Sequence, residues 1–432
     1  MTNEEILEII EAEGVEFIRL QFTDIFGNLK NVAVPARNID RVMDNKFIFD
    51  ASSIYDKYRT GEKEMYLYPD LDTFVILPWR PQHGKVARFI CDVYDINGEP
   101  FGMCPRGILK KVLDSAHSEG YKFYIDPECE FFLFHTDEKG LPTTVMHEDA
   151  GLMSVGPNDL GENARREIVL SLEKMGFEIE ASYHENAPSQ HEIDFREGEA
   201  LQIGDSITTL KYAVRSVAKS FGLHATFMPK PKNDLPGSGM HFNFSVYKDD
   251  RNIFNFVDDT KELKDEARWF IGGVLEYAPQ MCLFTNPLTN SYKRLIHGYE
   301  APTEVVWSMV HTNPAIKIWN RPSEDNKMEI RFPDPSANPY IAIALCIAAG
   351  MEGIKRKIEP GEPVMDSYDY DEEKGFPVSL FEAARFAKSS DFIKNVLGEE
   401  FSKFFIKVKK EESEEYMKQV TDWERRNYLT RV

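Results

Sequence analysis

The sequence has few cysteines, and their placement argues against disulfides. Its 432 residues include five, which are odd in number and mostly set among apolar neighbours: Cys91, Cys104, Cys129, Cys282 and Cys346. Disulfide frameworks belong to small secreted domains, whereas scattered thiols in a long chain are typical of a reducing compartment. We therefore predict reduced core cysteines in a cytoplasmic protein.

Long apolar runs and positive charge are also scarce. The longest apolar run, from Tyr340 to Met351, is shorter than the about 20 residues that a helix needs to cross a bilayer. The N-terminal sequence MTNEEILEII is acidic and lacks a signal-peptide pattern. With 51 Lys and Arg against 72 Asp and Glu, the net charge is −21, which argues against nucleic acid or an anionic membrane as partner. The net charge does not exclude ATP as a ligand, because ATP is usually bound by a local site whose charge can differ from that of the whole chain.

Several enzyme motifs are missing from the sequence. It contains no GxxxxGK(S/T) P-loop, no GxGxxG dinucleotide fingerprint, no HExxH and no GxSxG. The glycines Gly237 and Gly239 are a weak phosphate-binding signal, and a plain turn explains them in isolation.

The residues that are present suffice for a large core and for about two or three domains. The chain is 42% hydrophobic and 12% aromatic, which excludes general disorder. In the first 100 residues, the patterns predict a helix over 3–13, a hairpin of strands 17–22 and 29–34, and strands over 73–77 and 87–93. Beyond Pro100 and Pro105, helices are expected over 106–120, 161–175, 206–221, 260–278, 337–357 and within 379–432. We predict an α+β fold with domains 1–100 and 101–432.

Four predicted strands carry unusual polar faces. With side chains alternating along a strand, the segments 128–134, 190–195, 239–245 and 328–332 each place polar residues on one face. These faces hold Glu128 and Glu130; Gln190, Glu192 and Asp194; His241, Asn243 and Ser245; and Glu329 and Arg331. Solvated amphipathic strands are the ordinary interpretation, but such faces usually carry Lys and Thr. If the faces instead line one cavity, the carboxylates require cations, and oxygen-rich sites with one imidazole suit Mg²⁺ or Mn²⁺.

Over nearly its whole length the chain resembles type I prokaryotic glutamine synthetase. The matching segments, in order, are FDASSI (49–54), MYLYPDLDTF (65–74), PECEFFLF (127–134), NDLGENARREIVL (158–170), HENAPSQHEIDF (184–195), HATFMPKP (224–231), GSGMHFNFS (237–245), NSYKRLIHGYEAP (290–302) and EIRFPDPSANPY (329–340). The resemblance implies a β-grasp N-terminal domain, a catalytic domain with a curved antiparallel sheet, and a homo-dodecamer with active sites between neighbouring chains. The short C-terminal region, which lacks an insertion and an adenylylation tyrosine, is closer to the α subgroup.

The resemblance also implies roles for individual residues. Glu128, His241 and Glu329 match the ligands of a first Mg²⁺ or Mn²⁺ ion, and Glu130, Glu185 and Glu192 those of a second, with two or three ions per site. Arg294, Arg331 and Gly237 match residues at the substrate glutamate; Asp50 matches the acid that helps deprotonate ammonium, and Glu300 the glutamate that closes the site. Asn243, Ser245 and Lys317 match positions near ATP. The implied chemistry is phosphorylation of the γ-carboxylate of glutamate by ATP, followed by attack of ammonia on the γ-glutamyl phosphate.

The chain departs from the family pattern around this site. Ala51 replaces a usual Gly, Leu152 a Tyr beside the ammonium site, Pro236 an Asn at glutamate, and His297 a Pro. After Ser308 the usual pattern contains two phosphate-facing arginines, and Thr312 and Lys317 stand there instead. Lys317 keeps the positive charge of arginine but lacks its planar guanidinium, and Thr312 removes the positive charge.

Three functions are compatible with these residues. One is a working glutamine synthetase that uses glutamate, ammonium and ATP. Another is a γ-glutamyl ligase that takes a different amine. The third is an impaired paralogue with a regulatory or assembly role. Nitrogen-regulatory proteins or a synthetase paralogue are candidate partners. Nucleic acid and membrane are not expected as partners.

Overall fold

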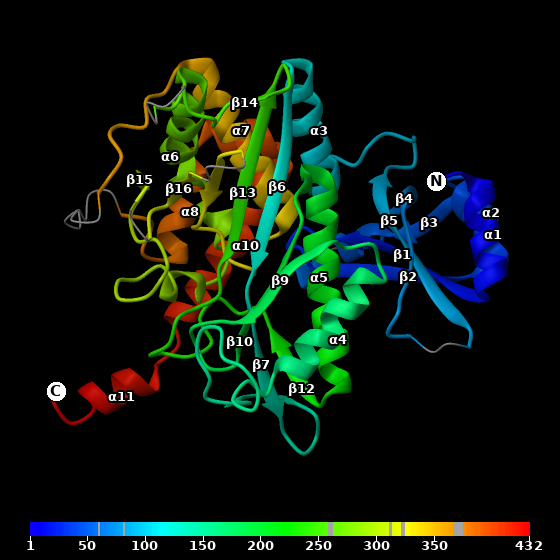
Figure 1. Cartoon of the computed structure of the whole chain (residues 1–432), viewed down its shortest axis with the longest axis horizontal. Helices are drawn as coiled ribbons and strands as arrows, with labels where there is room; N and C mark the ends of the chain where they lie inside the picture. The colour runs from blue at the N-terminus through cyan, green and yellow to red at the C-terminus, as the bar shows by residue number, and fades with distance from the viewer. Residues whose placement is uncertain (59–60, 81–82, 258–261, 311–312, 321–324, 366–374) are drawn as a thin grey trace.

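The N-terminal part forms one sheet with two helices beside it (Figure 1). The computed structural model describes residues 1–432 apart from 59–60, 81–82, 258–261, 311–312, 321–324 and 366–374. The elements here are α1 (Asn3–Glu13), α2 (Ile39–Met43), β1 (Val15–Thr23), β2 (Leu29–Pro35), β3 (Phe47–Asp50), β4 (Glu64–Ile76) and β5 (Lys85–Tyr94). The strand order is β2-β1-β5-β4-β3, in which only the β1–β5 pair is parallel. The predicted hairpin and mixed domain are confirmed.

The bounds of α1 agree with the predicted range because both of its ends are encoded locally. Thr2 and Glu5 form a capping box at the N-terminal end, and Gly14 ends the helix with φ 65°. A left-handed residue at this position is a common helix stop, and glycine adopts it without strain.

The rest of the chain alternates helices with two sheets. The helices are α3 (Pro105–Ser118), α4 (Glu162–Glu173), α5 (Ala200–Ser220), α6 (Asp265–Thr285), α7 (Pro339–Arg356), α8 (Leu380–Ser389), α9 (Asp391–Leu397), α10 (Glu399–Met417) and α11 (Asp422–Tyr428). The predicted start of α5 at residue 206 and end of α6 at 278 were wrong. α5 already begins at Ala200, and α6 continues through Pro279, because both helices are largely buried and their packing outweighs local signals.

The two sheets divide at Glu130. One sheet contains β6 (Tyr121–Cys129), β11 (Gly198–Glu199), β13 (Met240–Lys248), β14 (Arg251–Asn252), β15 (Trp307–Ser308), β16 (Ile316–Trp319) and β17 (Lys327–Ile330). The other contains β7 (Phe131–Thr136), β8 (Pro142–Met146), β9 (Ile179–His184), β10 (Gln190–Phe195) and β12 (Leu223–Thr226). All pairings given for these strands are antiparallel except β15 with β16. The α+β class is thus confirmed.

One strand prediction was wrong in detail. The segment 128–134 is not a single strand, because the chain leaves the first sheet after Cys129 and enters the second at Phe131. Glu130 lies between them, where its N–H donates to the Gly239 carbonyl at 3.2 Å. The break places Glu130 at the junction of the sheets, which positions the site described below.

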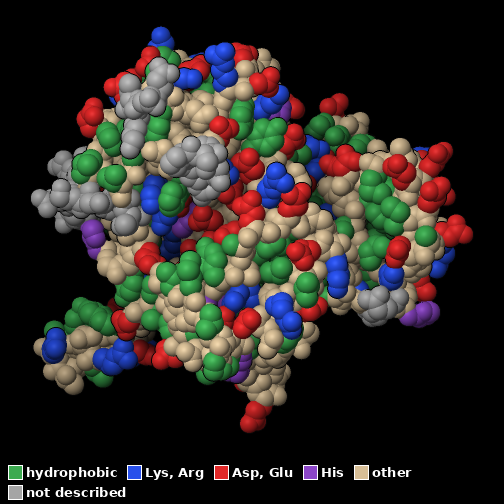
Figure 2. All heavy atoms as spheres, viewed as in Figure 1, with side chains coloured by type: hydrophobic (Ala, Val, Ile, Leu, Met, Phe, Trp, Pro, Cys, Tyr) green, Lys and Arg blue, Asp and Glu red, His purple; other side chains and the backbone are tan. Residues whose placement is uncertain are grey.

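The apolar run of the sequence and the cysteines belong to the core. α7 contains the Tyr340–Met351 run and is buried along most of its length. All five cysteines are buried and unpaired, as predicted. Among the described residues, no helix is long and apolar enough to cross a membrane. Acidic side chains are spread over the visible face, in line with the net charge of −21 (Figure 2).

A buried arginine joins the N-terminal sheet to the catalytic part. Arg106 on α3 is 3% exposed and contacts Asp70 of β4 at 2.7 Å and Asp92 of β5 at 2.9 Å. It also bonds both carboxylate oxygens of Asp205 on α5, each at 2.9 Å. Because breaking a buried ion network leaves uncompensated charges, this contact fixes the two parts of the chain together.

Candidate active site

Each of the four predicted strands contributes part of its polar face to one cavity. It measures about 300 Å³ and lies where the two sheets separate. Its lining residues are Glu128, Glu130, Leu152, Met153, Tyr183, Glu185, Asn186, Glu192, Gly237, Gly239, His241, Arg294, Glu300, Ala301, Asn313 and Arg331. The alternative of solvated strand faces is therefore wrong for these segments, since Glu192 and His241 are only 3% and 6% exposed.

The first acid cluster is built around His241 on β13. Its Nδ1 lies 2.9 Å from Glu128 of β6 and 3.4 Å from Glu329 of β17, the two strands that flank β13. Asn243 donates to the other oxygen of Glu128 at 2.9 Å. Burial raises the pKa of Glu128, but the hydrogen bond and charge of His241 outweigh it and lower the pKa to about 2. Glu128 is thus held as a carboxylate.

Glu329 is the most enclosed member of this cluster. It is fully buried, and its carboxylate contacts Arg331 on one oxygen and accepts a hydrogen bond from Trp319 Nε1 at 2.7 Å on the other. A hydrogen bond to a carboxylate side chain that coordinates a metal fixes the orientation of that carboxylate. Trp319 therefore orients Glu329, a contact that the sequence patterns did not predict.

The second acid cluster contains Glu130, Glu185 and Glu192. Glu130 accepts from Gln190 Nε2 at 2.8 Å and from the Gly239 N–H at 3.0 Å. Burial and then the charge of Glu185 raise the pKa of Glu130 to about 8. Burial and the charges of its acidic neighbours also raise the pKa of Glu192 well above its ordinary value. In this cluster the carboxylates repel one another.

The second cluster has the chemistry of a divalent cation site. Glu192 Oε1 and the nearby Asp194 Oδ1 are buried, and neither has a hydrogen-bond partner within the described part of the chain. Buried carboxylates are normally compensated by hydrogen bonds, cations or protonation. A divalent cation with oxygen ligands would supply what these residues lack, so the donor set fits Mg²⁺ or Mn²⁺.

Two glycines allow the backbone to approach the cavity closely. A Cβ at Gly239 would lie 2.5 Å from His241 Nε2 and 2.8 Å from an Arg294 terminal nitrogen, and one at Gly237 would lie 2.2 Å from the Pro229 carbonyl oxygen. Arg294, 3% exposed, donates to the Arg331 and Phe332 carbonyls at 3.0 Å each. The glycines thus leave room for a fixed arginine.

Glu300 lines the cavity and is hydrogen-bonded to another lining residue. Its Oε1 accepts a hydrogen bond from Asn186 Nδ2 at 2.6 Å, and the Asn186 backbone N–H donates to Glu185 at 3.0 Å. The loop that carries Glu300 is therefore linked through Asn186 to the acidic cluster.

Two of the predicted catalytic and metal-binding residues are not among those that line the cavity. Glu329 lies behind it, in contact with the lining residues His241 and Arg331. Asp50, at the exposed end of β3, accepts hydrogen bonds from the Ser52 N–H at 2.9 Å and the Lys63 N–H at 3.2 Å. Asp50 is thus held by its own domain, apart from the acid clusters.

The three residues predicted near the nucleotide also lie outside the lining. Asn243 lies behind Glu128, and Ser245 donates to Glu197 at 3.1 Å. Lys317 lies with its ammonium 4.0 Å from the centre of the Trp319 ring. All three are carried by the sheet that contains β13 and β16.

The departures from the family pattern fall in different places. Leu152 lines the cavity and is 49% exposed, and Pro236 precedes the lining residue Gly237. His297 is exposed, and Ala51 is buried. Thr312 lies outside the described residues.

Three polar lining residues were not predicted. Tyr183 of β9 lies opposite Glu192 of β10. Because Tyr183 stands two residues before Glu185, the alternation of side chains along a strand could have predicted that both face the cavity. Burial and the charges of Glu192 and Asp194 raise its pKa. Asn186 and Asn313 come from loops, where side-chain direction has no sequence period.

Comparisons with known proteins find relatives that match this chain over nearly its whole length. Residues 14–96 match the glutamine synthetase beta-Grasp domain, and residues 102–428 match the glutamine synthetase catalytic domain. Glutamine synthetase of Clostridium saccharobutylicum is 45% identical, over 100% of this chain and 99% of its own; that of Staphylococcus aureus (strain N315) is 45% identical over 99% and 98%. The solved structure "Apo GmaS without ligand" has a TM-score of 0.87 at 29% identity and covers 98% of both chains. This chain belongs to the glutamine synthetase family.

Proposed function

We propose that this chain is an ATP-dependent ligase that forms glutamine from glutamate and ammonium through a γ-glutamyl phosphate. The observation that carries the proposal is the single cavity in which carboxylates, one histidine and two arginines converge. Full-length relatives named glutamine synthetase, 45% identical, support the same reaction. Enzymes of this family use divalent metal ions and ATP.

Two groups of side chains would hold the metal ions. Glu128, His241 and Glu329, whose ligand atoms lie within 4.8 Å of one another, would hold the first. Glu130, Glu185 and Glu192 would hold the second. Bound cations would offset negative charge on the phosphoryl group that is transferred. The chain's own part is to keep Glu128 ionised and to bring the acids of two sheets together.

Glutamate would bind between the arginines and the glycine turn. Arg331 lines the cavity, and Arg294 is fixed by backbone carbonyls beside Gly239. A guanidinium recognises a carboxylate through two parallel hydrogen bonds, which orients the substrate as well as binding it. Gly237, at the same wall, would leave room for the amino-acid backbone.

Ammonium would be bound and deprotonated by Asp50 and Glu300. Asp50 does not line the cavity of its own chain, so we propose that it completes the site of a neighbouring chain. This arrangement requires an oligomer, and we propose the homo-dodecamer and the α subgroup. We also propose a domain boundary at 100/101, where Pro100 and Pro105 flank the junction.

ATP would approach along β13 and β16. Asn243 and Ser245 on β13 and Lys317 on β16 are the chain's residues for the nucleotide. A related structure is titled "GmaS/ADP complex-Conformation 1", and ADP is the product that the proposed reaction leaves. Lys317 would offer a point charge rather than a bidentate fork.

A second candidate, a γ-glutamyl ligase for another amine, is favoured by Leu152. Its half-exposed apolar side chain lines the cavity at the position where the family usually carries Tyr beside the ammonium site. An apolar side chain there favours an alkyl amine over ammonium, which needs polar partners.

Phosphate release by the purified protein tests these functions together. The protein is incubated with glutamate, ATP and Mn²⁺, first with ammonium and then with a panel of primary amines. Phosphate release that depends on ammonium supports glutamine synthesis, and release only with an amine supports the second candidate. Absence of turnover, recovered in the Thr312→Arg, Lys317→Arg double variant, indicates an impaired paralogue, because two guanidiniums restore charge for the triphosphate.

A further inference from the structure

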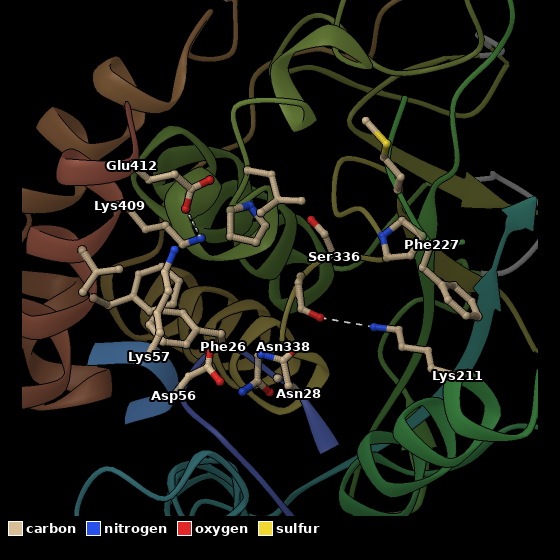
Figure 3. A pocket seen from close by; sticks show the side chains of 18 of the residues that line it. Phe26, Asn28, Asp56, Lys57, Lys211, Phe227, Ser336, Asn338, Lys409 and Glu412 are labelled. Carbon is tan, nitrogen blue, oxygen red and sulfur yellow. Dashed lines mark hydrogen bonds and ion pairs between the residues drawn. The ribbon is translucent and has the colours of Figure 1, made fainter. Parts of the chain in front are cut away.

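A second cavity lies away from the candidate active site (Figure 3). It measures about 400 Å³ and is enclosed by the turn between β1 and β2, by α5, by α10 and by the loop that leads into α7. It shares no lining residue with the carboxylate cavity. Its presence is therefore not explained by the proposed reaction.

The charged side chains of this cavity are unbalanced. Four are basic, Lys57, Lys211, Arg215 and Lys409, and two are acidic, Asp56 and Glu412. Both acids already have partners: Asp56 pairs with Lys30 at 2.7 Å, and Glu412 with Lys409 at 2.8 Å. Figure 3 shows the Lys409–Glu412 pair on the α10 side, across the cavity from Lys211 on the α5 side. The positive charge of Lys57, Lys211 and Arg215 remains.

Lys211 is the least expected of these residues. It is 8% exposed, and the hydrogen bond found for its ammonium goes to the Ala337 carbonyl at 3.3 Å, although an ammonium has three donors. Among the described residues, no carboxylate forms an ion pair with it. The acid that acts on it from a distance, Asp334, accepts hydrogen bonds from Ser336 and Asn286 instead.

Arg215 adds a second positive charge beside Lys211. It lies four residues further along α5, which places it on the same helix face, and its guanidinium lies 5.0 Å from the centre of the Phe227 ring. Burial lowers the pKa of Lys211 to about 8, and the charge of Arg215 acts in the same direction. Like charges at this spacing are unfavourable, and an anion placed between them would remove the penalty.

We propose that this cavity binds a small organic anion whose phosphate or carboxylate group contacts Lys211 and Arg215. The guanidinium suits an oxyanion because its parallel donors match two oxygens. Phe26, Phe227 and Phe405 also line the cavity, and its volume exceeds that of a bare oxyanion, so the ligand carries an apolar part. The proposal does not rest on the proposed function.

Calorimetry and thermal melting of the full-length protein test the site. The probes are phenyl phosphate and benzoate, which carry the two head groups on the same apolar ring, with chloride as control. The variants are Lys211→Met, Arg215→Gln and, as matched control, Lys219→Met, an exposed lysine on the same helix. Phenyl phosphate bound at the catalytic cavity is unaffected by these changes, so the difference between variants reports on this cavity.

We expect at least one probe to bind, with Kd raised about 10-fold or more by Lys211→Met and by Arg215→Gln and unchanged by Lys219→Met. Without an anion, Lys211→Met should melt at the same temperature or higher, because it removes an unpaired buried charge.

No binding of either probe, or equal binding by all variants, would overturn the proposal. So would an anion-independent loss of stability in Lys211→Met with unchanged affinity, which would mean that Lys211 only supports the Ala337 loop. Arg215→Gln, at the exposed rim, keeps the test valid if Lys211→Met does not fold.

Discussion

The repulsion within the acid cluster should be measurable in the metal-free protein through Glu130→Gln. The pKa of Glu130 is raised from 4.5 to about 8, so at pH 7 the native state must hold a proton that the unfolded chain releases. The pH of 7 lies 2.5 units above the ordinary pKa of 4.5. Holding this proton at pH 7 therefore lowers the free energy of unfolding by about 3 kcal/mol, at about 1.36 kcal/mol per unit. The substituted amide keeps an oxygen to accept from Gln190 and Gly239, but it never ionises.

The sign of the pH dependence follows from the raised pKa. The native state binds more protons than the unfolded state between pH 4.5 and 8, so wild-type stability should fall as the pH rises through this window. Glu130→Gln should therefore melt at a higher temperature than wild type at pH 7. With about 2.1 cal/mol/K per residue over 432 residues, about 3 kcal/mol corresponds to about 3 °C.

Thermal melts in EDTA at pH 5, 6, 7 and 8 provide the measurement. The stabilisation by Glu130→Gln should be small at pH 5 and grow toward pH 8. The exposed Glu138, replaced by Gln, serves as the matched control and should show no such trend. A Glu130→Gln protein that melts below wild type at pH 7, or a difference that does not change with pH, would refute the reasoning.

Three further outcomes are expected. Millimolar Mn²⁺ should raise the melting temperature of wild type but much less that of Glu192→Gln, because a ligand that binds only the folded state adds about 2.7 kcal/mol at 100 times Kd; calorimetry that detects equal binding by both would contradict this. Trp319→Phe should weaken Mn²⁺ binding about 10-fold by releasing Glu329, whereas an unchanged titration would make that hydrogen bond irrelevant to the metal. Asp50→Asn and Arg331→Gln proteins should each be inactive, and co-expression should restore part of the activity if one chain supplies Asp50 to another; absence of recovery in verified mixed oligomers would argue against shared sites.

Local sequence signals predicted the features that depend on neighbouring residues. The apolar spacing of residues 3–13 predicted α1, whose ends Thr2 and Gly14 then define, and period two placed Glu192 and His241 on polar strand faces, which the structure shows to be buried. These features survive because no distant contact competes with them.

Features that depend on distant contacts were not predictable from the pattern. The break at Glu130 exists because two sheets meet there, and no residue type marks it. The Trp319–Glu329 bond and the three aspartates around Arg106 join different strands or different domains. We propose that Asp50 acts in the cavity of a neighbouring chain, and a pattern within one chain carries no information about such a placement.

The most direct test of the proposed function is the formation of labelled glutamine. The purified wild-type protein is incubated with glutamate, ATP, Mn²⁺ and ¹⁵N-ammonium, and the products are analysed by mass spectrometry, with Glu192→Gln as the control. We expect ¹⁵N-glutamine in amounts matching the ADP and phosphate released, and none with the control. Robust ATP-dependent joining of glutamate to another amine without ¹⁵N-glutamine, or no product from a folded, metal-bound protein, would contradict the proposed function.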